Sequence, residues 1–494
     1  MRINSNINLL IFSILISLAL LSCQKEEFIT DSGARPSFSE DTLLFDTVFV
    51  KIGSATKNLR VYNPYDKTLT ISSIRLAGGN SSVFRMNVNG VPGRSFSDIE
   101  IRGGDSIWIF VEVTMNPSAG LQLPFIIQDS IIFETNGNLQ DIDLVAWGQN
   151  AHFFVAKKQN PNLPPYVIID TLLNRTTTWT DTLPYVIYGG YAVVDSSNTL
   201  VIESGTQLHF SNGAGLWIYK GGTLKVRGSK EKPVVFQGLR REYFLKDEPG
   251  QWDRIWLNDG GDHEIDYALI KNAFIGLQCE TLFSPAMPVS LKLTNTEIRN
   301  ISGLGLFTRN YRVQGWNNVI ANCGLYCAAL TGGGDYEFLH STFTSFWRYG
   351  QRSTPAVYVN NYLLNSNGQA VPVDLTKSEF KNSIIYGDND NELEVDFKSG
   401  AQDNHNFRFC LIKADNNTPT SDPAHFESIF RNNNPGFEDP AEHDLHLDSL
   451  SFCREKGNAA FLVPGLTPPV TIDLDGNLRP NGGSDPDLGA YDRN

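Results

Sequence analysis

Several signatures that would identify a function at once are missing from this chain of 494 residues. There is no Gly-x-Ser-x-Gly elbow, no His-Glu-x-x-His pair and no phosphate-binding loop. These motifs mark serine hydrolases, zinc proteases and nucleotide-binding proteins. Patterns of long helices are scarce, and the apolar run from Leu9 to Leu21 has only 13 residues, which is too few to span a bilayer comfortably.

The chain also has fewer basic than acidic residues, and it has few cysteines. Forty Lys and Arg residues stand against 54 Asp and Glu, a formal net charge of −14, which excludes nucleic acid because phosphate binding needs a basic surface. Five cysteines follow Cys23, an odd number without a tight framework. This pattern favours buried thiols over a disulfide scaffold. Cys323 and Cys327 have no His or Cys pair at metal-ligand spacing, so we expect no zinc site.

What the chain does contain predicts an all-β protein of two or more domains. It has 42 Gly and 24 Pro, with short segments rich in Ile, Val, Phe and Thr between them. The length exceeds that of one ordinary domain.

The N-terminus has the pattern of an export signal. Arg2 and the apolar run end at Ser22-Cys23, as in a signal peptide. Leu20-Leu21-Ser22-Cys23 resembles the lipobox of bacterial lipoproteins, which implies a signal peptide over 1–22 and a lipid on Cys23. A plain secretory signal with an incidental cysteine is the alternative.

The residues after Cys23 suggest a location. Gln24-Lys25-Glu26-Glu27 resembles the acidic signal that, in one group of Gram-negative bacteria, directs lipoproteins to the outer face of the outer membrane. A charged, solvated linker would have the same composition. We expect a lipidated tether over 23–39, an outer-membrane lipoprotein exposed at the surface, and the membrane as a partner through its lipid.

Residues 40–157 are predicted to form an immunoglobulin-like β-sandwich. About seven short alternating segments are separated by turns such as Gly103-Gly104 and Asn136-Gly137, which suits that fold. The stretch from Lys57 to Ile71 resembles bacterial relatives of the ASPM/SPD-2/Hydin family, whose members act mainly as spacers or adhesion modules.

A repeated phrase, an apolar residue followed two positions later by Asn or Ser, indicates a solenoid. Its copies begin at Ile270, Ile298, Ile320, Phe343 and Phe380, and the Asn/Ser positions lie 28, 22, 23 and 37 residues apart. We expect the apolar residues to stack inside and the Asn residues to turn the backbone or stack on one another.

Short strands entered through Gly-Thr turns precede these copies, at Gly205-Thr206 and Gly222-Thr223. They resemble the first rungs of right-handed parallel β-helices of the pectate-lyase-like superfamily. We therefore predict such a solenoid over 165–494, with a C-terminal cap region from about 441 to 494. In that region Asp473 to Pro480 and Asp485 to Tyr491 resemble the "DxDGxxRP…DxGAY" ending of many secreted β-helix proteins. Its aspartates suggest either calcium or ordinary turns and a cap.

One acidic run is a candidate metal site. It comprises Asp388, Asp390, Glu392, Glu394 and Asp396. Alternation predicts that its last three members share one face of a strand, and three like charges on one face attract a cation, with calcium as the candidate cofactor. The alternative is a solvated strand face with an acidic turn.

Two clusters of aromatic and basic residues are candidate ligand sites. Trp347, Arg348 and Tyr349 follow His340 closely, and a second group runs from Trp252 to Trp256. Exposed rings stack on sugars, so these residues suit a glycan groove. Core packing is the alternative.

A pattern of Asp, then Ser or Thr, then an aliphatic residue occurs seven times. It resembles the O-glycosylation acceptor of the same bacterial group. The copies begin at Asp41, Asp46, Asp105, Asp129, Asp170, Asp181 and Asp448. Ordinary turn chemistry at strand entrances is the alternative.

These observations predict a lipid-anchored cell-envelope protein that presents a β-helix rod to bind glycan or protein at the cell surface. No catalytic set is recognisable. One alternative is a polysaccharide lyase or glycoside hydrolase acting on a polyanionic, plant or host glycan. That enzyme would need at least three carboxylates and an Arg, Lys or His in one cleft. A structural spacer is the second alternative.

Overall fold

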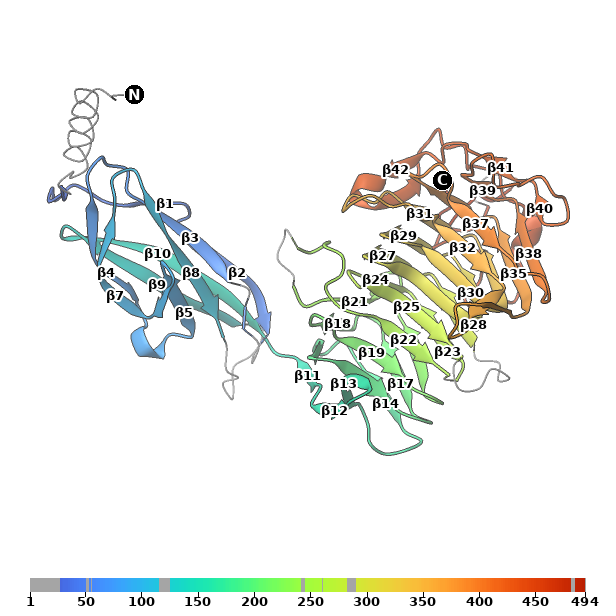
Figure 1. Ribbon diagram of the computed structural model, residues 1–494, viewed down its shortest axis with the longest axis horizontal. Coiled ribbons are helices and arrows are strands. Elements are labelled where there is room, and N and C mark those ends of the chain that lie inside the picture. The colour runs from blue at the N-terminus through green and yellow to red at the C-terminus, as the bar shows by residue number, and fades with distance from the viewer. Residues whose placement is uncertain are drawn as a thin grey trace, which may run out of the picture. The chain divides into compact units, whose positions relative to one another are not determined.

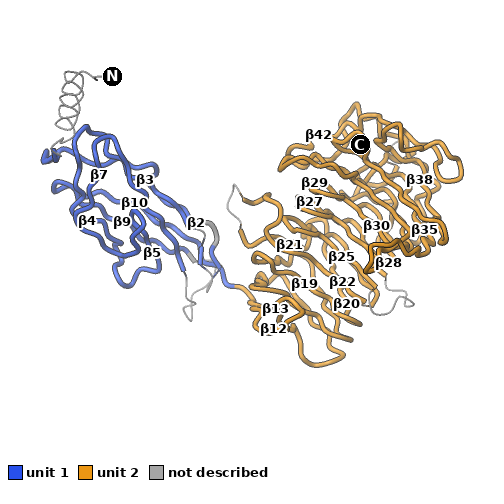
Figure 2. The backbone as a smooth tube through the Cα atoms, viewed as in Figure 1, with its two compact units in different colours: residues 1–150 blue, residues 151–494 orange. Residues whose placement is uncertain are grey.

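The computed structural model describes residues 27–49, 53–54, 56–114, 125–240, 245–259, 261–281, 290–480 and 485–493. It divides the chain into two compact units, Met1–Asn150 and Ala151–Asn494 (Figure 2). Strands account for 53% of the structure and helices for 2%, which confirms the all-β prediction. The predicted signal peptide, Cys23 and the first part of the tether lie outside the described residues. Within the described ranges, no helix is long and apolar enough to cross a membrane.

The first unit consists of two five-stranded sheets with strand orders β1-β3-β8-β5-β6 and β2-β10-β9-β4-β7 (Figure 1). The first sheet contains β1 (Ser37–Phe38), β3 (Lys57–Tyr62), β8 (Ser106–Val113), β5 (Phe84–Val88) and β6 (Val91–Gly93). The second contains β2 (Thr42–Phe49), β10 (Asn138–Gln149), β9 (Phe125–Thr135), β4 (Leu69–Leu76) and β7 (Ser95–Ile101). A 3-10 turn, η1 (Gly79–Ser81), precedes β5.

Side-chain alternation joins the two sheets through one core. In β8, Ile107 and Ile109 are buried whereas Trp108 and Phe110 are exposed, as the period of two in a strand requires. Phe45 of one sheet and Phe84 of the other pack with their ring centroids 5.5 Å apart. The unit is therefore a sandwich with an apolar interior.

The second unit is built on two large sheets of mainly parallel strands. The 11-stranded sheet contains, in order, β11 (His152–Val155), β15 (Tyr185–Tyr188), β18 (Gln207–Phe210), β21 (Val234–Gly238), β24 (Ala268–Lys271), β27 (Glu297–Ile301), β29 (Val319–Cys323), β31 (Thr342–Ser345), β36 (Ile384–Gly387), β39 (Leu411–Ile412) and β41 (Phe430–Arg431).

The 18-stranded sheet receives two strand segments from most turns of the chain. It contains β12 (Lys158–Asn160), β13 (Leu163–Ile168), β14 (Thr176–Trp179), β16 (Tyr191–Val194), β17 (Thr199–Glu203), β19 (Gly215–Ile218), β20 (Thr223–Arg227), β22 (Ile255–Asn258), β23 (His263–Asp266), β25 (Ile275–Glu280), β26 (Ser290–Thr294), β28 (Leu304–Trp316), β30 (Ala328–Leu339), β32 (Val357–Asn360), β35 (Leu375–Lys381), β37 (Leu393–Asp396), β38 (Asp403–Arg408) and β40 (Phe426–Glu427).

The second unit also contains smaller elements outside these two sheets. They are the hairpins β33 (Tyr362–Leu364) with β34 (Ala370–Pro372) and β42 (Phe437–Asp439) with β43 (Asp444–Leu447), and the 3-10 turns η2 (Pro440–Glu442) and η3 (Ala459–Phe461).

The predicted stacking of the repeated isoleucines is confirmed. Ile270 pairs with Ile298, Ile298 with Ile320, and Ile320 with Phe343, always in parallel register. All four side chains are fully buried in one continuous core. Each turn of the chain thus places an apolar residue over its counterpart in the turn before.

The last copy of the phrase is an exception. Phe380 pairs with Phe338 and Phe407 in the 18-stranded sheet, so it does not continue the column of Ile270. Its place in that column is taken by Ile385, which pairs with Phe343.

Residues in the left-handed conformation, many of them asparagines, turn the backbone at two series of corners in the coils. At the first corner the left-handed residues are stacked in register, with φ between 44° and 57°, and comprise Tyr267, Asn295, Asn317, His340, Asn382, Phe409 and Ser428. At the second corner, Asn272, Asn300 and Asn322 have φ of 66°, 54° and 52°. Asparagine tolerates this conformation better than other residues that carry a Cβ.

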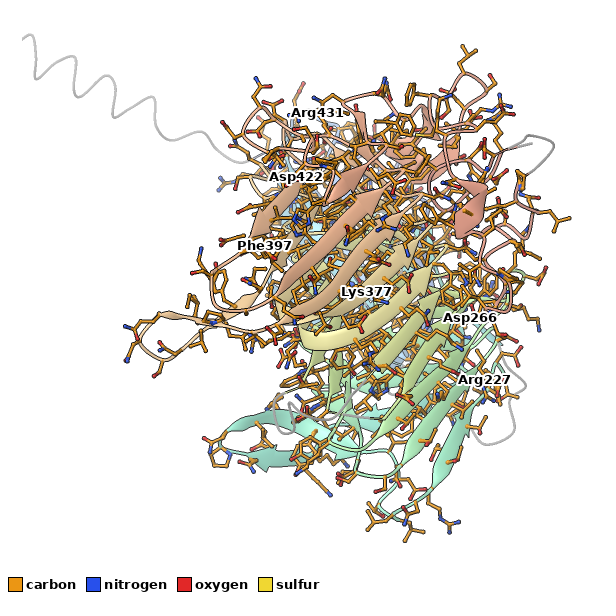
Figure 3. The ribbon with its side chains drawn as sticks, turned by 90° about the vertical axis from the view of Figure 1, so that its right-hand side faces the viewer. Arg227, Asp266, Lys377, Phe397, Asp422 and Arg431 are labelled. Atoms are coloured by element: carbon orange, nitrogen blue, oxygen red, sulfur yellow. The ribbon has the colours of Figure 1, made fainter. Side chains whose placement is uncertain are left out.

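Ion pairs cover the outer face of the 18-stranded sheet, where Arg227, Asp266 and Lys377 lie (Figure 3). Glu264 lies between Lys225 and Lys292, at 3.6 and 3.0 Å, each on a neighbouring turn. Such partly exposed pairs contribute little to stability. The charged side chains keep the outer face of the 18-stranded sheet hydrated.

The C-terminal segment packs along the outer face of the 11-stranded sheet. Leu445 and Ala490 contact Val319 and Ala321 in a small apolar cluster. Arg479 is buried and donates to Asn317 Oδ1 at 2.5 Å and to the carbonyl of Ala490 at 2.6 Å. This arginine therefore ties the tail to the asparagine corner.

The aspartates of the tail accept hydrogen bonds from the tail itself. Asp473 accepts from the backbone N–H groups of Asn477 and Asp492, at 2.6 and 2.9 Å. Asp487 accepts from those of Glu455 and Arg493, at 2.7 and 2.9 Å. These four bonds give the aspartates the turn and cap role that was one of the two predicted interpretations.

Candidate functional site

The predicted aromatic triplet lies on the loop that joins β31 to β32, residues 346–356. The loop begins where the backbone N–H of Phe346 donates to Asn322 Oδ1 at 3.0 Å. The Phe346 ring packs edge-on against Phe437 with centroids 6.3 Å apart. One turn of the coil and the C-terminal segment thus fix the start of the loop.

This loop forms one wall of a pocket of about 190 Å³, which we call the Trp347 pocket. It is lined by Asp247, Asn300, Asn322, Phe346, Trp347, Arg348, Tyr349, Ala441, Glu442 and His443. The structure therefore brings the predicted residues Trp347, Arg348 and Tyr349 together with residues from four other segments. Sites for drug-sized ligands start at about 300 Å³, so this pocket suits a single small ring.

Two aromatic side chains lie next to each other in the pocket lining. The rings of Trp347 and Tyr349 lie 5.1 Å apart at 57°, and Tyr349 is 48% exposed. The Tyr349 hydroxyl donates to the carbonyl of Asp247 at 3.2 Å. A Cβ on Gly324 would lie 2.9 Å from Trp347 Cζ2, so that glycine leaves room for the indole.

A neutral histidine sits at the base of the pocket. His443 lies 2.9 Å from Asn322 Nδ2 through Nδ1 and 3.2 Å from the Asn300 side-chain amide through Nε2. Because the Phe346 N–H occupies Asn322 Oδ1, the Asn322 amide nitrogen donates to Nδ1, which leaves the proton on Nε2. An N–H donates only to an acceptor, so the Asn300 amide pairs with Nε2 when its Oδ1, which is otherwise without a partner, is turned toward the ring. Burial and the nearby charge of Arg299 lower the pKa of His443 to about 4. With both ring nitrogens engaged, His443 organises the two asparagines.

One of the charged side chains in the pocket lining, Asp247, forms ion pairs with two cations. Asp247 Oδ1 lies 3.5 Å from Lys271 Nζ and 4.0 Å from Arg299 Nη1. Burial lowers the pKa of Lys271 from its usual value. The pocket thus offers ring faces, amides and balanced charge, which suit an uncharged polar ligand.

A buried ion pair holds the aromatic loop in place. Arg352 donates to both carboxylate oxygens of Glu392, at 2.8 and 2.5 Å, and both side chains are almost fully buried. Glu392 also accepts from the backbone N–H groups of Ala356 and Asn389, at 2.8 and 2.9 Å. The pair therefore clamps the loop 346–356 to the turn before β37.

This pairing corrects the interpretation of the acidic run. Glu392 is 0% exposed and points at Arg352, whereas Glu394 is exposed. Asp396 binds Lys398 Nζ at 2.6 Å and the Tyr362 hydroxyl at 2.5 Å. No group of three or more His, Cys, Asp or Glu side chains that could hold a metal ion occurs in the described ranges, so these three residues, Asp388 and Asp390 do not come together as the predicted cluster. The sequence pattern missed that a corner interrupts the strand before Glu392.

His340 does not belong to the pocket either. It is 0% exposed and occupies the first corner, where Asn382 Nδ2 lies 3.0 Å from its Nε2. Burial lowers the pKa of His340 well below its usual value. Its proximity to Trp347 in sequence gave no information about its position, because the chain changes sheets between the two residues.

The second aromatic group is divided between interior and surface. Trp252 is 1% exposed and stacks on Phe210 at 4.3 Å, so it belongs to the core. Trp256 faces outward and stacks on Trp217 at 4.8 Å and 12°. Trp217 is itself only 5% exposed, which leaves little ring face for a ligand.

Turn hydrogen bonds occur at several of the Asp-Ser/Thr-aliphatic copies. Asp105 and Asp129 accept from the backbone N–H of the following serine, at 2.7 and 2.8 Å. Asp170 and Asp448 accept from the backbone N–H of the leucine two residues later, at 2.9 and 2.6 Å. These bonds are the turn chemistry of the alternative interpretation.

The five cysteines after Cys23 have free, buried thiols, as predicted. Burial raises the pKa of the Cys410 thiol to about 12. These side chains act as small apolar residues of the core.

The fold and the pocket define an all-β protein with a sandwich unit and a unit of stacked parallel sheets. No protein-family model and no curated protein matches the chain. Among solved structures, PapD-like domain 7 of human CEP192 is 9% identical over 27% of this chain and 97% of that one, with a TM-score of 0.17. The catalytic domain of a GH87 alpha-1,3-glucanase in complex with tetrasaccharides is 10% identical over 72% of this chain and 81% of that one, with a TM-score of 0.14.

A third similarity is with a family 123 glycoside hydrolase from Clostridium perfringens. It is 10% identical, covers 28% of this chain and has a TM-score of 0.17. The match spans about a quarter of that structure, 26%. At these TM-scores the similarities carry no argument about function.

Proposed function

We propose that this protein is a lipid-anchored cell-envelope protein whose second unit, a right-handed parallel β-helix, binds glycan through the Trp347 pocket. The observation that carries the proposal is that the adjacent rings of Trp347 and Tyr349 line the same pocket as the amides of Asn300 and Asn322. A sugar ring presents an apolar face to aromatic side chains and hydroxyl groups to amides and carboxylates.

The parallel pairing supports the β-helix. Each strand pairs with one contributed by the next turn of the chain, as from β24 to β27 and from β27 to β29. The chain passes through the 18-stranded sheet between one such strand and the next, and the apolar residues stay in columns. A right-handed sense is expected because parallel crossovers are almost always of that hand.

The lipid anchor rests on the sequence before the described residues. If Cys23 carries the lipid, cells fed labelled palmitate incorporate the label into the wild-type protein and not into Cys23→Ala, and the variant leaves the membrane fraction. Equal labelling of the two proteins would contradict the anchor. Protease added to intact cells tests the proposed surface exposure separately, since only a surface protein is degraded.

The pocket favours binding over cleavage. Its lining contains two carboxylates, those of Asp247 and Glu442, whereas the lyase or hydrolase alternative calls for three. Asp247 is held by Lys271 and Arg299, and the ring nitrogens of His443 are both engaged.

The test is a screen of the full chain on an array of plant, algal and host glycans. Replacing both Trp347 and Tyr349 with alanine removes two ring contacts, each worth about 0.5–1.5 kcal/mol beyond burial. We expect the affinity for the selected glycan to fall about tenfold or more. Tyr188→Ala is the matched control, since Tyr188 is 43% exposed on β15.

Two results would overturn the assignment. Binding that survives in the double variant would remove the pocket from the site. Release of shortened or unsaturated products from the bound glycan, lost on chelation, would favour the enzyme alternative.

A further inference from the structure

The outer face of the sheet β1-β3-β8-β5-β6 in the first unit is unusually rich in aromatic and arginine side chains. The residues that point outward on β3, β5 and β8 comprise Asn58, Arg60, Tyr62, Arg85, Asn87, Ser106, Trp108, Phe110 and Glu112. No aliphatic side chain occurs among them. Trp108 and Phe110 are each 41% exposed, so their ring faces remain accessible.

The Trp108 and Phe110 rings lie next to each other with nearly parallel planes. Trp108 and Phe110 are two residues apart on β8, with centroids 6.4 Å apart and planes only 19° from parallel. Arg60 pairs with Trp108 across the strands and lies 5.1 Å from its ring centroid and 5.2 Å from that of Tyr62. Arg60 Nε donates to Ser106 Oγ at 2.8 Å, which fixes the guanidinium between the rings.

A hollow whose lining includes Phe110 lies next to these rings. It has a volume of about 650 Å³, and its lining includes Arg85, Asn87, Arg94 and Glu112. Arg94 Nη1 donates to the carbonyls of Gly79 and Asn80, at 3.0 and 2.7 Å, which holds this cation at the rim. The Oδ1 atom of Asn87 has no hydrogen-bond partner in the described part of the chain.

The charge of this face is opposite to that of the chain. Arg60, Arg85 and Arg94 are accompanied by Glu112, which lies 3.7 Å from Arg85, whereas the whole chain has a net charge of −14. A local basic patch in an acidic protein attracts an anionic partner. Guanidinium groups also bind carboxylates and sulfates through paired hydrogen bonds.

We propose that this face, Arg60, Tyr62, Arg85, Arg94, Trp108 and Phe110, binds an anionic polysaccharide whose sugar rings pack against the exposed parts of Trp108 and Phe110 and whose acid groups meet the arginines. The site goes beyond the Trp347 pocket, because it belongs to the other unit and selects for charge. Carboxylated and sulfated chains share the required chemistry.

The experiment measures retardation of the full chain in native gels that contain polygalacturonate, dextran sulfate or neutral dextran. We expect retardation by at least one of the two anionic polymers, not by dextran, with an affinity that falls as salt increases. Trp108→Ala combined with Phe110→Ala, and separately Arg60→Gln combined with Arg85→Gln, should each weaken it about tenfold. The two polymers distinguish a carboxylate from a sulfate source.

The controls stay within the same unit. Leu139→Ala changes a 69% exposed side chain of the other sheet, and Arg75→Gln removes an exposed arginine of β4. Neither should change the retardation.

Retardation by neither anionic polymer, or equal retardation of wild type and the Trp108/Phe110 variant, would overturn the proposal. A change in oligomeric state of that variant would assign the face to contacts between copies instead, which also overturns it. The Trp347/Tyr349 variant should keep this binding, so failure at one site does not imply failure at the other.

Discussion

Arg352 and Glu392 show how strongly the candidate pocket depends on single buried residues. Glu392→Gln keeps the shape of the side chain but leaves the Arg352 guanidinium without its counter-charge. Breaking a buried ion pair costs about 3–5 kcal/mol. We expect a loss of about 3 kcal/mol in the free energy of unfolding of the second unit, measured by urea denaturation.

Glu394→Gln is the matched control for that variant, because Glu394 is exposed two residues further on. It should change the free energy of unfolding by less than about 0.5 kcal/mol. Equal effects of the two substitutions would contradict the role assigned to the clamp. The Glu392 variant should also lose affinity for the glycan bound at Trp347, since its loop is released.

We expect the charge of His446 to make the stability of the fold depend on pH. His446 lies 2.7 Å from Asp475 and 2.5 Å from Asp444, and the hydrogen bond to Asp475, with that to Asp444, raises the pKa of His446 from 6.5 to about 9. The protonated ring therefore stabilises the fold fully below about pH 6.5, and the contribution is lost as pH rises to about 9.

The matching measurement compares thermal unfolding of wild type and His446→Gln at pH 6 and pH 9. The difference in melting temperature between the two proteins should be larger at pH 6. A difference that grows toward pH 9 would contradict the assigned ion pairs.

At the scale of elements, the left-handed corners explain both the success and the error of the sequence pattern. Ile270, Ile298 and Ile320 were predicted to stack and do so, because each is followed two residues later by an asparagine that turns the chain. Phe380 has the same spacing to Asn382 but belongs to the other corner. An apolar residue two positions before a left-handed asparagine occurs at both corners, so the phrase alone could not distinguish them.

Asn272 offers a direct test of this explanation. Its φ is 66°, and its side chain donates to the carbonyl of Glu248 at 2.7 Å. Asn272→Ala and Asn272→Gly both lose that bond, but only alanine is strained in the left-handed region. We expect the alanine variant to be less stable than the glycine variant by about 1 kcal/mol in chemical denaturation. The reverse order would contradict the role of the corner.

At the scale of the whole molecule, the sequence predicted the class of fold and only part of the pocket. Trp347, Arg348 and Tyr349 are adjacent in sequence, so a local pattern was sufficient to find them. Asp247 comes from the connection between β21 and β22, and His443 comes from the C-terminal segment. Their convergence depends on how coils stack and on where the tail packs, which no local pattern encodes.

The acidic run shows the same limit. Its residues are close in sequence, and alternation placed Glu392 with Glu394 and Asp396. A corner before β37 instead directs Glu392 inward to Arg352. Like the assembly of the pocket, this pairing depends on contacts between segments 40 residues apart.

The most direct test of the central claim, that the Trp347 pocket binds a glycan, is hydrogen–deuterium exchange of the full chain with and without the array-selected ligand. The account predicts that peptides covering 245–249, 346–352 and 441–443 become protected together, because residues of all three segments line the pocket. Protection confined to other segments, or to one of these three, would contradict it.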